Sequence, residues 1–326
     1  MRIVVTGGAG FIGANLCREL VSRPCVEAVV VLDDLSTGSA ENLAGVDCQL
    51  ITGSILDPAL LADVVAGAET VVHLAARPSV PRSLADPMAS HTVNATGTLH
   101  VLEACRRTGA HVIVASSSSV YGAVTALPKH EDLPTRPLSP YAASKLATEA
   151  YALGHAAAFG VAALALRFFN VYGPLQATGH AYAAVVPAFV DAALRGEPLR
   201  VHGDGRQTRD FTYVGSVVRV LADAAERRAV SDVPVNLAFG SRASVLDLIE
   251  HLTALLGLEI SIRHEPARPG DVRHSQAADA RLRHLFPAAE SVPLADGLAR
   301  TVAWFRDQPQ YSSSRHQLAV QPISAR

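Results

Sequence analysis

The chain has 326 residues, of which 49% are hydrophobic and 18% are charged, so composition excludes a disordered protein and allows one large or two moderate domains. Its 28 basic and 30 acidic residues give a formal net charge of −2, which provides no general attraction for nucleic acid or an anionic membrane surface. We therefore expect neither as a partner, and any anionic ligand must be bound by local chemistry.

Short apolar runs alternate with helix-like segments over the first half of the chain. The runs read, in order, RIVVTG, AVVVLDD, CQLITG, TVVHLAA, HVIVASS and VAALALRFFN. Apolar strands without alternation, separated by amphipathic helices, indicate a parallel sheet covered on both faces. The sequence therefore predicts an α/β fold with a doubly wound parallel sheet of the Rossmann type.

The rhythm of the sequence changes after about residue 167, where Pro, Gly, Arg and Asp become frequent. We predict a first domain over residues 1–167, with a return segment at 211–238. A smaller α+β lobe, rich in loops, is expected over 168–210 and 239–307. The polar, aperiodic residues 308–326 predict a flexible tail.

The stretch VTGGAGFIG places Gly7, Gly10 and Gly13 directly after the first predicted strand and before a helix. This spacing allows a tight turn, a close approach of backbone to a pyrophosphate, and a helix N-terminus that faces it. Asp33 stands twenty residues after Gly13 at the end of the second strand, where its carboxylate can accept both hydroxyls of an adenosine ribose and would repel a 2′-phosphate. The pattern predicts NAD rather than NADP.

Two further segments predict a catalytic site. In YAASK, Tyr141 and Lys145 are four residues apart and share a helix face, so the ammonium is expected to lower the pKa of the phenol and allow it to act as a base. The four serines from Ser116 to Ser119 end an apolar strand, and ligands of open α/β sheets bind beyond the carboxyl ends of strands. We therefore expect the serines to line the site that Tyr141 reaches.

The cysteines and histidines carry no further signal. Cys17, Cys25, Cys48 and Cys105 have no paired spacing and are predicted to be buried thiols in a reducing compartment. The thirteen histidines show no metal-ligand spacing, and we expect no metal. Because no run of eighteen apolar residues occurs, a soluble cytoplasmic protein is expected.

The ordered motifs TGGAGFIG, HLAA, SSSVYG, YAASK, LRFFNVYGP, GDGRQTRDFTYV and RPGDVRHS resemble the extended short-chain dehydrogenase/reductase family. Within it, they are most similar to the NAD-dependent epimerases and dehydratases that include the UDP-glucose and UDP-N-acetylglucosamine 4-epimerases. The resemblance covers about residues 1–305. It implies bound NAD, a UDP-sugar substrate, transient oxidation at carbon 4 of the sugar, and a homodimer formed through two helices of the first domain.

The resemblance also implies roles for individual positions. The catalytic residues are expected to be Ser117, Tyr141 and Lys145. The expected contacts with NAD are Gly7, Gly10, Phe11, Ile12, Gly13, Asp33, Asp34, Ser36, Thr37, Gly38, Ser54, Ile55, Leu74, Ala75, Ala76, Arg77, Asn94, Tyr141 and Lys145. The expected contacts with the UDP-sugar are Arg82, Ser117, Ser118, Ser119, Asn170, Val186, Gln207, Arg209, Arg268, Asp271 and Ser275.

Departures from related enzymes bear on the reaction and the substrate. Sugar 4,6-dehydratases and UDP-glucuronate decarboxylases resemble this chain but have acidic residues where it has Ser118 and Ser119, so elimination lacks a general acid here. UDP-glucuronate 4-epimerases have an arginine where this chain has Ala177. Glucose-restricted relatives carry a bulky tyrosine at the position of Ser275, so the small residue leaves room for an N-acetyl group.

The sequence favours a 4-epimerase of UDP-N-acetylglucosamine, UDP-glucose or both. A UDP-glucuronate 4-epimerase and a nucleotide-sugar dehydratase remain alternatives. A dinucleotide-sensing regulator with the same fold is a further alternative, which the presence of both Tyr141 and Lys145 disfavours.

Overall fold

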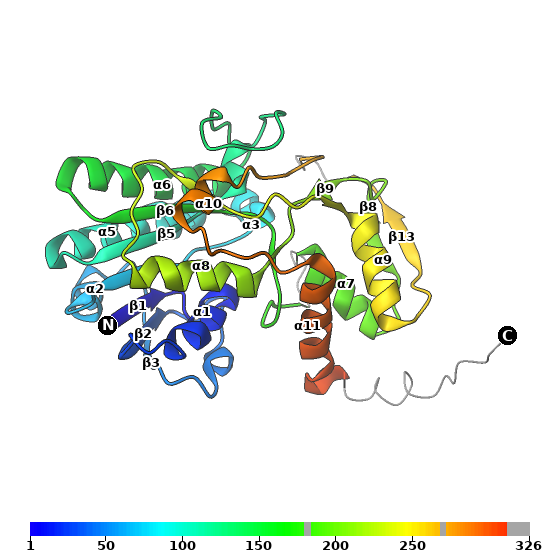
Figure 1. The fold of residues 1–326 in the computed structure, drawn as a ribbon, viewed down its shortest axis with the longest axis horizontal. Helices are drawn as coiled ribbons and strands as arrows, with labels where there is room; N and C mark the ends of the chain where they lie inside the picture. The colour runs from blue at the N-terminus through cyan, green and yellow to red at the C-terminus, as the bar shows by residue number, and fades with distance from the viewer. Residues whose placement is uncertain (179–183, 268–271, 312–326) are drawn as a thin grey trace.

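A computed structural model describes residues 1–178, 184–267 and 272–311 (Figure 1). Its centre is a seven-stranded parallel sheet, which confirms the predicted doubly wound α/β fold. In spatial order the strands are β11 (Val235–Leu237), β6 (Ala163–Phe168), β5 (His111–Ser117), β4 (Thr70–His73), β1 (Arg2–Thr6), β2 (Ala28–Asp33) and β3 (Gln49–Thr52).

Helices cover both faces of this sheet, which explains why its strands are apolar without alternation. One face packs against α1 (Phe11–Val21) and α8 (Val214–Glu226), and the other against α2 (Pro58–Val65), α5 (Gly97–Thr108) and α6 (Pro140–Phe159). Successive residues of β1 divide between the two cores, with Val5 on the α1 side and Val4 on the α5 side. Helical layers therefore cover both faces of the sheet, and the edge strand β3 stays partly exposed (Figure 1).

The direction of the strand order reverses between β1 and β4. Strands β2 and β3 follow β1 to one side, whereas β4, β5 and β6 extend to the other. A crevice opens at the carboxyl ends of parallel strands where the order reverses. The glycine-rich turn after β1 lies at this point, so the topology alone selects this edge of the sheet for a ligand.

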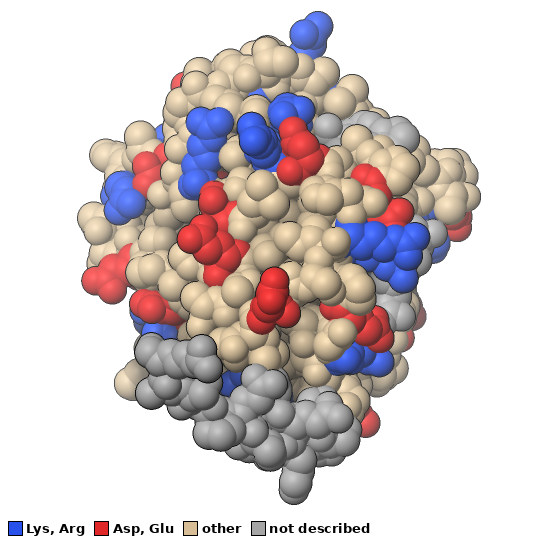
Figure 2. All heavy atoms as spheres, turned by 90° about the vertical axis from the view of Figure 1, so that its right-hand side faces the viewer, with Lys and Arg blue, Asp and Glu red and all other residues tan. Residues whose placement is uncertain are grey.

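The second lobe lies beyond this edge and is formed mainly by α7 (Val185–Leu194), α9 (Val245–Leu256) and α11 (Leu294–Arg306), seen on the right of Figure 1. Three two-stranded sheets accompany them: β8 (Leu199–His202) with β13 (Ile262–Glu265), β9 (Thr208–Arg209) with β12 (Ala243–Ser244), and β7 (Val171–Tyr172) with β10 (Thr212–Tyr213). Basic and acidic side chains are interspersed over its surface (Figure 2).

The remaining elements of the described residues are short. They are η1 (Ala40–Leu43), α3 (Val80–Ala85), α4 (Pro87–His91), the π-helical turn η2 (Thr92–Thr96), η3 (Ser118–Tyr121), α10 (Ala280–Leu285) and η4 (Pro309–Tyr311). Tyr311 is 1% exposed and packs on Phe305, with ring centroids 6.1 Å apart. The predicted flexible tail is therefore wrong for residues 309–311, because this aromatic side chain is buried; residues 312–326 lie outside the described residues.

The cysteine prediction holds only in part. Cys17 and Cys105 are buried, but Cys48 is half-buried and Cys25 is exposed. Cys25 lies in the turn between α1 and β2, where the chain runs over the surface. The prediction of a buried thiol is wrong there, because position in a connection outweighs the apolar character of the residue.

Candidate active site

A cavity of about 590 Å³ opens at the carboxyl ends of β1, β2, β4, β5 and β6. The β1–α1 turn forms one wall and requires glycine at two positions. Gly7 has φ +73°, and a Cβ on it would lie 2.6 Å from the backbone nitrogen of Ala75; a Cβ on Gly13 would lie 2.2 Å from the carbonyl oxygen of Gly7. The turn thus brings the N-terminus of α1 to the cavity, an arrangement that suits a diphosphate.

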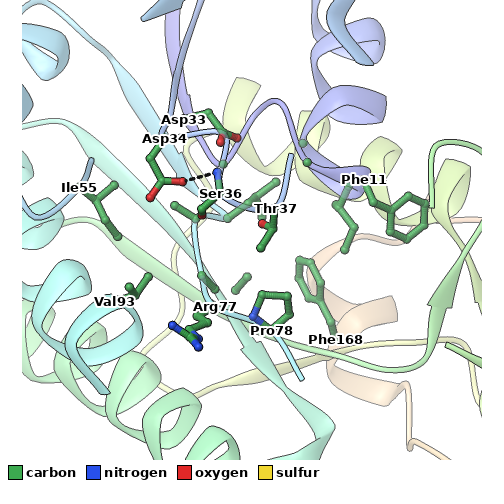
Figure 3. Close-up of a pocket in the computed structure, with 18 of the residues that line it drawn as sticks. Phe11, Asp33, Asp34, Ser36, Thr37, Ile55, Arg77, Pro78, Val93 and Phe168 are labelled. Carbon is green, nitrogen blue, oxygen red and sulfur yellow. Dashed lines mark hydrogen bonds between the residues drawn. The ribbon is translucent and has the colours of Figure 1, made fainter. Parts of the chain in front are cut away.

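The carboxylate of Asp33 is held from two sides at the end of β2. Its Oδ2 accepts a hydrogen bond from the backbone of Ala9 at 2.9 Å, and its Oδ1 accepts one from Leu35 at 2.9 Å. Burial raises the pKa of Asp33, and the two amides oppose that increase. Figure 3 shows Asp33, Asp34, Ser36 and Thr37 on one side of the cavity, and Asp34 accepts from the Ser36 amide at 2.9 Å. Each carboxylate oxygen has a second lone pair for a ribose hydroxyl.

The predicted catalytic residues come together at the other end of the cavity. Helix α6 begins after Ser139, whose hydroxyl caps the Ala142 amide at 3.1 Å, and the helix presents Tyr141 and Lys145 to the cavity one turn apart. Ser117 is the last residue of β5, lines the same cavity and lies close enough to the Tyr141 phenol to act on its pKa. The structure therefore places a serine hydroxyl, a phenol and an ammonium at one site.

The electrostatics differ from the prediction that Lys145 lowers the pKa of Tyr141. Burial raises the pKa of the Tyr141 phenol, and the nearby Ser117 side chain opposes the increase. Burial also lowers the pKa of Lys145 to about 8, and its Nζ donates to the carbonyl oxygen of Ala115 at 2.8 Å. The prediction is wrong for this structure because desolvation dominates the phenol and the ammonium is engaged by a backbone carbonyl.

Most positions predicted to contact NAD line this cavity: Gly7, Gly10, Phe11, Ile12, Gly13, Asp33, Asp34, Ser36, Thr37, Ser54, Ile55, Leu74, Ala75, Ala76, Arg77, Tyr141 and Lys145. Two do not. Gly38 lies behind the glycine turn, where a Cβ would be 2.7 Å from the carbonyl carbon of Ala9. Asn94 is buried, accepts from the Arg77 amide at 2.7 Å and donates to the Ser144 hydroxyl at 2.9 Å, so it supports the cavity wall from outside.

The positions predicted to contact the sugar nucleotide are more dispersed. Ser117 and Asn170 line the cavity. Seven described positions do not line it: Arg82, Ser118, Ser119, Val186, Gln207, Arg209 and Ser275. Gln207 donates to the His202 carbonyl at 2.9 Å, Arg209 donates to the Arg273 carbonyl at 3.2 Å, and the Ser275 amide donates to the Thr208 carbonyl at 3.0 Å. Arg268 and Asp271 lie outside the described residues.

Ser116 lines the cavity, as expected for the serines that end β5. Several other lining residues were not predicted: Leu32, Gly53, Pro78, Val93, Ala115, Phe168, Val171 and Gln176. Gln176 donates from Nε2 to the Val171 carbonyl at 3.2 Å, while its buried Oε1 has no hydrogen-bond partner within the described part of the chain. A glutamine two residues after the VYGP segment was the available signal. Apart from Val93 of η2 and Pro78 of the loop after β4, the others lie at strand ends, where position in the sheet is a better guide than residue type.

Neither a metal site nor a membrane span emerges from residues 1–178, 184–267 and 272–311. Three or more His, Cys, Asp or Glu side chains do not gather as metal ligands in these ranges. The helices described there also lack the combination of length and hydropathy that a membrane crossing needs.

Residues 3–238 match the NAD dependent epimerase/dehydratase family. A UDP-glucose 4-epimerase of Mycolicibacterium smegmatis is 37% identical over 319 residues, which cover 95% of this chain and 100% of that protein. The UDP-N-acetylglucosamine 4-epimerase structure from Methanobrevibacter ruminantium M1, in complex with UDP-N-acetylmuramic acid, superposes with a TM-score of 0.88 at 35% identity and covers 93% of this chain and 97% of its own.

A relative with another activity is similar at a lower level. The dTDP-glucose 4,6-dehydratase of Streptomyces niveus is 33% identical over 320 residues, covering 94% of this chain and 93% of that protein. The glycine turn, the carboxylates at the end of β2, the cluster of Ser117, Tyr141 and Lys145, and these similarities agree over nearly the whole length. The chain is therefore a member of the NAD-dependent epimerase/dehydratase family, an enzyme family of nucleotide-sugar chemistry.

Proposed function

We propose that this protein is an NAD-dependent UDP-hexose 4-epimerase. The observation that carries the proposal is that Ser117, Tyr141 and Lys145 meet in the cavity that also holds the glycine turn and Asp33. Proton transfer and nucleotide binding are thereby combined at one site. The similarity to UDP-glucose and UDP-N-acetylglucosamine 4-epimerases supports the same reaction.

The residues present fit NAD. The crowded backbone at Gly7 and Gly13 leaves an uncovered helix N-terminus for the diphosphate. Asp33 and Asp34 would accept the adenosine ribose hydroxyls, and their negative charge would oppose a 2′-phosphate. Bound NAD would supply an acceptor for hydride from carbon 4 of the sugar and return that hydride to the opposite face.

The protein's own groups would move the proton. The phenolate of Tyr141 accepts the proton of the 4-hydroxyl, and the Ser117 hydroxyl bridges the sugar oxygen and the phenol. The Lys145 ammonium, which donates to the Ala115 carbonyl here, would have to leave it when the ligand binds in order to stabilise the phenolate. The 4-keto sugar then turns in the cavity, and Tyr141 returns the proton to the epimeric oxygen.

Epimerisation rather than elimination is favoured by the lack of an acid at the sugar end. Among the described residues that line the cavity, the carboxylates are Asp33 and Asp34, which belong to the end of β2. At the positions where the dehydratases have acidic residues, this chain has Ser118 and Ser119. A serine hydroxyl is too weak an acid to protonate a leaving hydroxyl at neutral pH.

The proposed substrates are UDP-N-acetylglucosamine and UDP-N-acetylgalactosamine, with or without the UDP-glucose pair. Ser275 is small and half-buried, which supports space for an N-acetyl group. Ala177 is exposed and offers no cation to a sugar carboxylate, which disfavours UDP-glucuronate. Neither Ser275 nor Ala177 takes part in the proton transfer proposed for Tyr141 and Ser117.

The test is incubation of purified protein with UDP-glucose, UDP-N-acetylglucosamine and UDP-glucuronate separately, with and without added NAD, followed by proton NMR. Inversion at carbon 4 without change in mass is the expected result. Loss of water or carbon dioxide would instead assign a dehydratase or a decarboxylase. No turnover of UDP-N-acetylglucosamine at high protein concentration would rule out the N-acetylated pair.

A homodimer through α5 and α6 is part of the proposal. On α6, Tyr151 is 41% exposed and Phe159 is 59% exposed, although both are large apolar side chains. Arg106 of α5 lies 5.3 Å from the Phe159 ring centroid, so the exposed ring lies beside α5. We expect Phe159→Glu to lower the sedimentation coefficient to that of a monomer, whereas an unchanged value would contradict this interface.

A further inference from the structure

A buried ion pair lies beneath the catalytic end of the cavity, and the chemistry proposed above does not use it. Arg167 of β6 donates from Nη2 to Oε1 of Glu149 at 2.6 Å and from Nε to Oε2 of the same carboxylate at 2.9 Å. The two side chains are only 3% and 4% exposed. Two parallel hydrogen bonds at this depth fix the orientation of both groups.

The pair is connected to the catalytic residues through Ser116. The Ser116 hydroxyl donates to Oε2 of Glu149 at 2.7 Å and lies 3.4 Å from the backbone carbonyl oxygen of Lys145. Ser116 directly precedes Ser117, and Glu149 follows Lys145 by one helical turn. The carboxylate of Glu149 therefore ties the end of β5 to the part of α6 that reaches the cavity.

Arg167 extends the connection across the sheet. In the parallel register it pairs with Ser116 on one side and Asn236 of β11 on the other. Its guanidinium carbon lies 4.7 Å from the ring centroid of Tyr121, and the Tyr121 hydroxyl donates to Asn236 at 2.7 Å. Arg167 directly precedes Phe168, which lines the cavity. Thus a polar row crosses three strands immediately below the site.

Stability alone does not account for this pair. Burial of two charges carries a desolvation cost that the ion pair only offsets, and apolar residues of similar volume often serve equally well. The pair fixes the position of Ser116, and it places a net charge of zero beneath the two titratable groups Tyr141 and Lys145. A single unpaired charge at this depth would act on them with little screening.

We propose that Glu149 and Arg167 are positioning residues: through Ser116 they hold Ser117 in register with Tyr141 and Lys145, and together they leave no unbalanced charge beneath that site. The inference rests on the proposed function for the roles of Ser117, Tyr141 and Lys145. It adds two residues that neither touch the cavity nor transfer a proton.

Other titratable groups surround the same site and limit what can shift its ionisation. His73 of β4 faces Lys145, and burial together with that ammonium lowers its pKa to about 3, so it is neutral. Tyr121 of η3 faces Arg167, and Glu131, from the loop between η3 and α6, acts on Tyr121. None of these groups replaces the charge of Glu149 or Arg167 if one of the pair is removed.

The test is a pH titration of Tyr141 in the protein without ligand, measured by the absorbance of the phenolate. For each variant, the absorbance of the same protein carrying Tyr141→Phe is subtracted, so that only Tyr141 contributes. Arg167→Met leaves a buried carboxylate, which disfavours phenolate, so the titration moves up by about half a pH unit or more. Glu149→Gln leaves a buried guanidinium and moves it down by a similar amount. The double variant Glu149→Gln/Arg167→Met is expected to titrate close to the native protein.

The variant Arg167→Lys separates geometry from charge. It keeps the positive charge but cannot make the two parallel hydrogen bonds to Glu149. We expect an unchanged Tyr141 titration, a kcat lowered about tenfold and an unchanged KM for the UDP-sugar. Shifts of the two single variants in the same direction, or no shift, would overturn the charge argument. Native kcat in Arg167→Lys would overturn the positioning role.

Separate control experiments test whether the variants fold and whether the proposed function holds. Circular dichroism reports whether Arg167→Met and Glu149→Gln fold; if either does not, Arg167→Lys and Glu149→Asp provide the kinetic test with charge retained. Because the titration needs no substrate, a native protein without UDP-sugar turnover overturns the proposed function and leaves the charge argument to be decided by the absorbance shifts.

Discussion

The cavity at the edge of the central sheet and the second lobe present the side chains predicted to be functional in different ways. At the first, Gly7, Asp33 and Ser117 stand at the ends of parallel strands, whose register fixes them relative to one another. In the second lobe, Arg209 and Ser275 lie on short strands and connections and do not line the described cavity. A site built on a sheet edge is set by topology, whereas one built on connections depends on individual side-chain contacts.

The largest effect is expected at the sheet edge. Tyr141→Phe removes the group proposed to exchange the substrate proton, and we expect kcat to fall by about 10³-fold with little change in the affinity for NAD. Epimerisation followed by NMR and NAD binding followed by calorimetry measure the two quantities. Equal losses of both would show that the tyrosine holds the cofactor instead.

The second largest effect is expected where the backbone is crowded, in the glycine turn between β1 and α1. Gly13→Ala places a Cβ 2.2 Å from the Gly7 carbonyl oxygen, so the turn must open, and we expect NAD affinity to fall at least about 100-fold. Gly154→Ala on α6 is the matched control, because its Cβ would meet nothing within 4 Å. That control should bind NAD normally and be stabilised by up to about 1 kcal/mol. Normal NAD binding by Gly13→Ala would contradict the assignment of the turn.

The second lobe should show a pH dependence through Asp210. Burial raises its pKa from 3.8 to about 6, and the carboxylate accepts from the Ala277 amide at 3.1 Å and the Ser241 hydroxyl at 2.8 Å. Because the folded state binds the proton more tightly than the unfolded state, stability falls as pH rises through this interval, by about 2–3 kcal/mol.

Denaturant unfolding of the native protein and Asp210→Asn across that interval measures this contribution. We expect the variant to lose the decrease in unfolding free energy between about pH 4 and pH 6. An equal slope in both proteins would assign the pH dependence to other groups. Since Asp210 joins the segments next to Arg209 and Ser275, the same variant should raise KM more than it lowers kcat.

The smallest effect is expected from Ser275→Tyr. The added ring should lower turnover of UDP-N-acetylglucosamine relative to UDP-glucose by about tenfold, because a filled volume excludes the N-acetyl group. Ser275→Ala keeps the volume and should leave the ratio unchanged. If the tyrosine variant also keeps the native ratio, the N-acetyl group is not accommodated at this position.

The order of elements and the glycine turn followed from the sequence by itself. Apolar runs without alternation require a sheet covered on both faces, and Gly7 and Gly13 have local backbone requirements that neighbouring residues reveal. The spacing of Tyr141 and Lys145 likewise places them on one helix face whatever packs against it.

Only the tertiary structure decided how these groups are held. The amides that engage Asp33, the carbonyl that receives Lys145, and the carboxylate of Glu149 that joins Arg167 to Ser116 come from different elements. Burial, which sets the pKa of Tyr141, also depends on the whole assembly. Contacts between residues far apart in the chain follow no local periodicity. Because the sequence analysis relied on local periodicity and spacing, it could not predict these contacts.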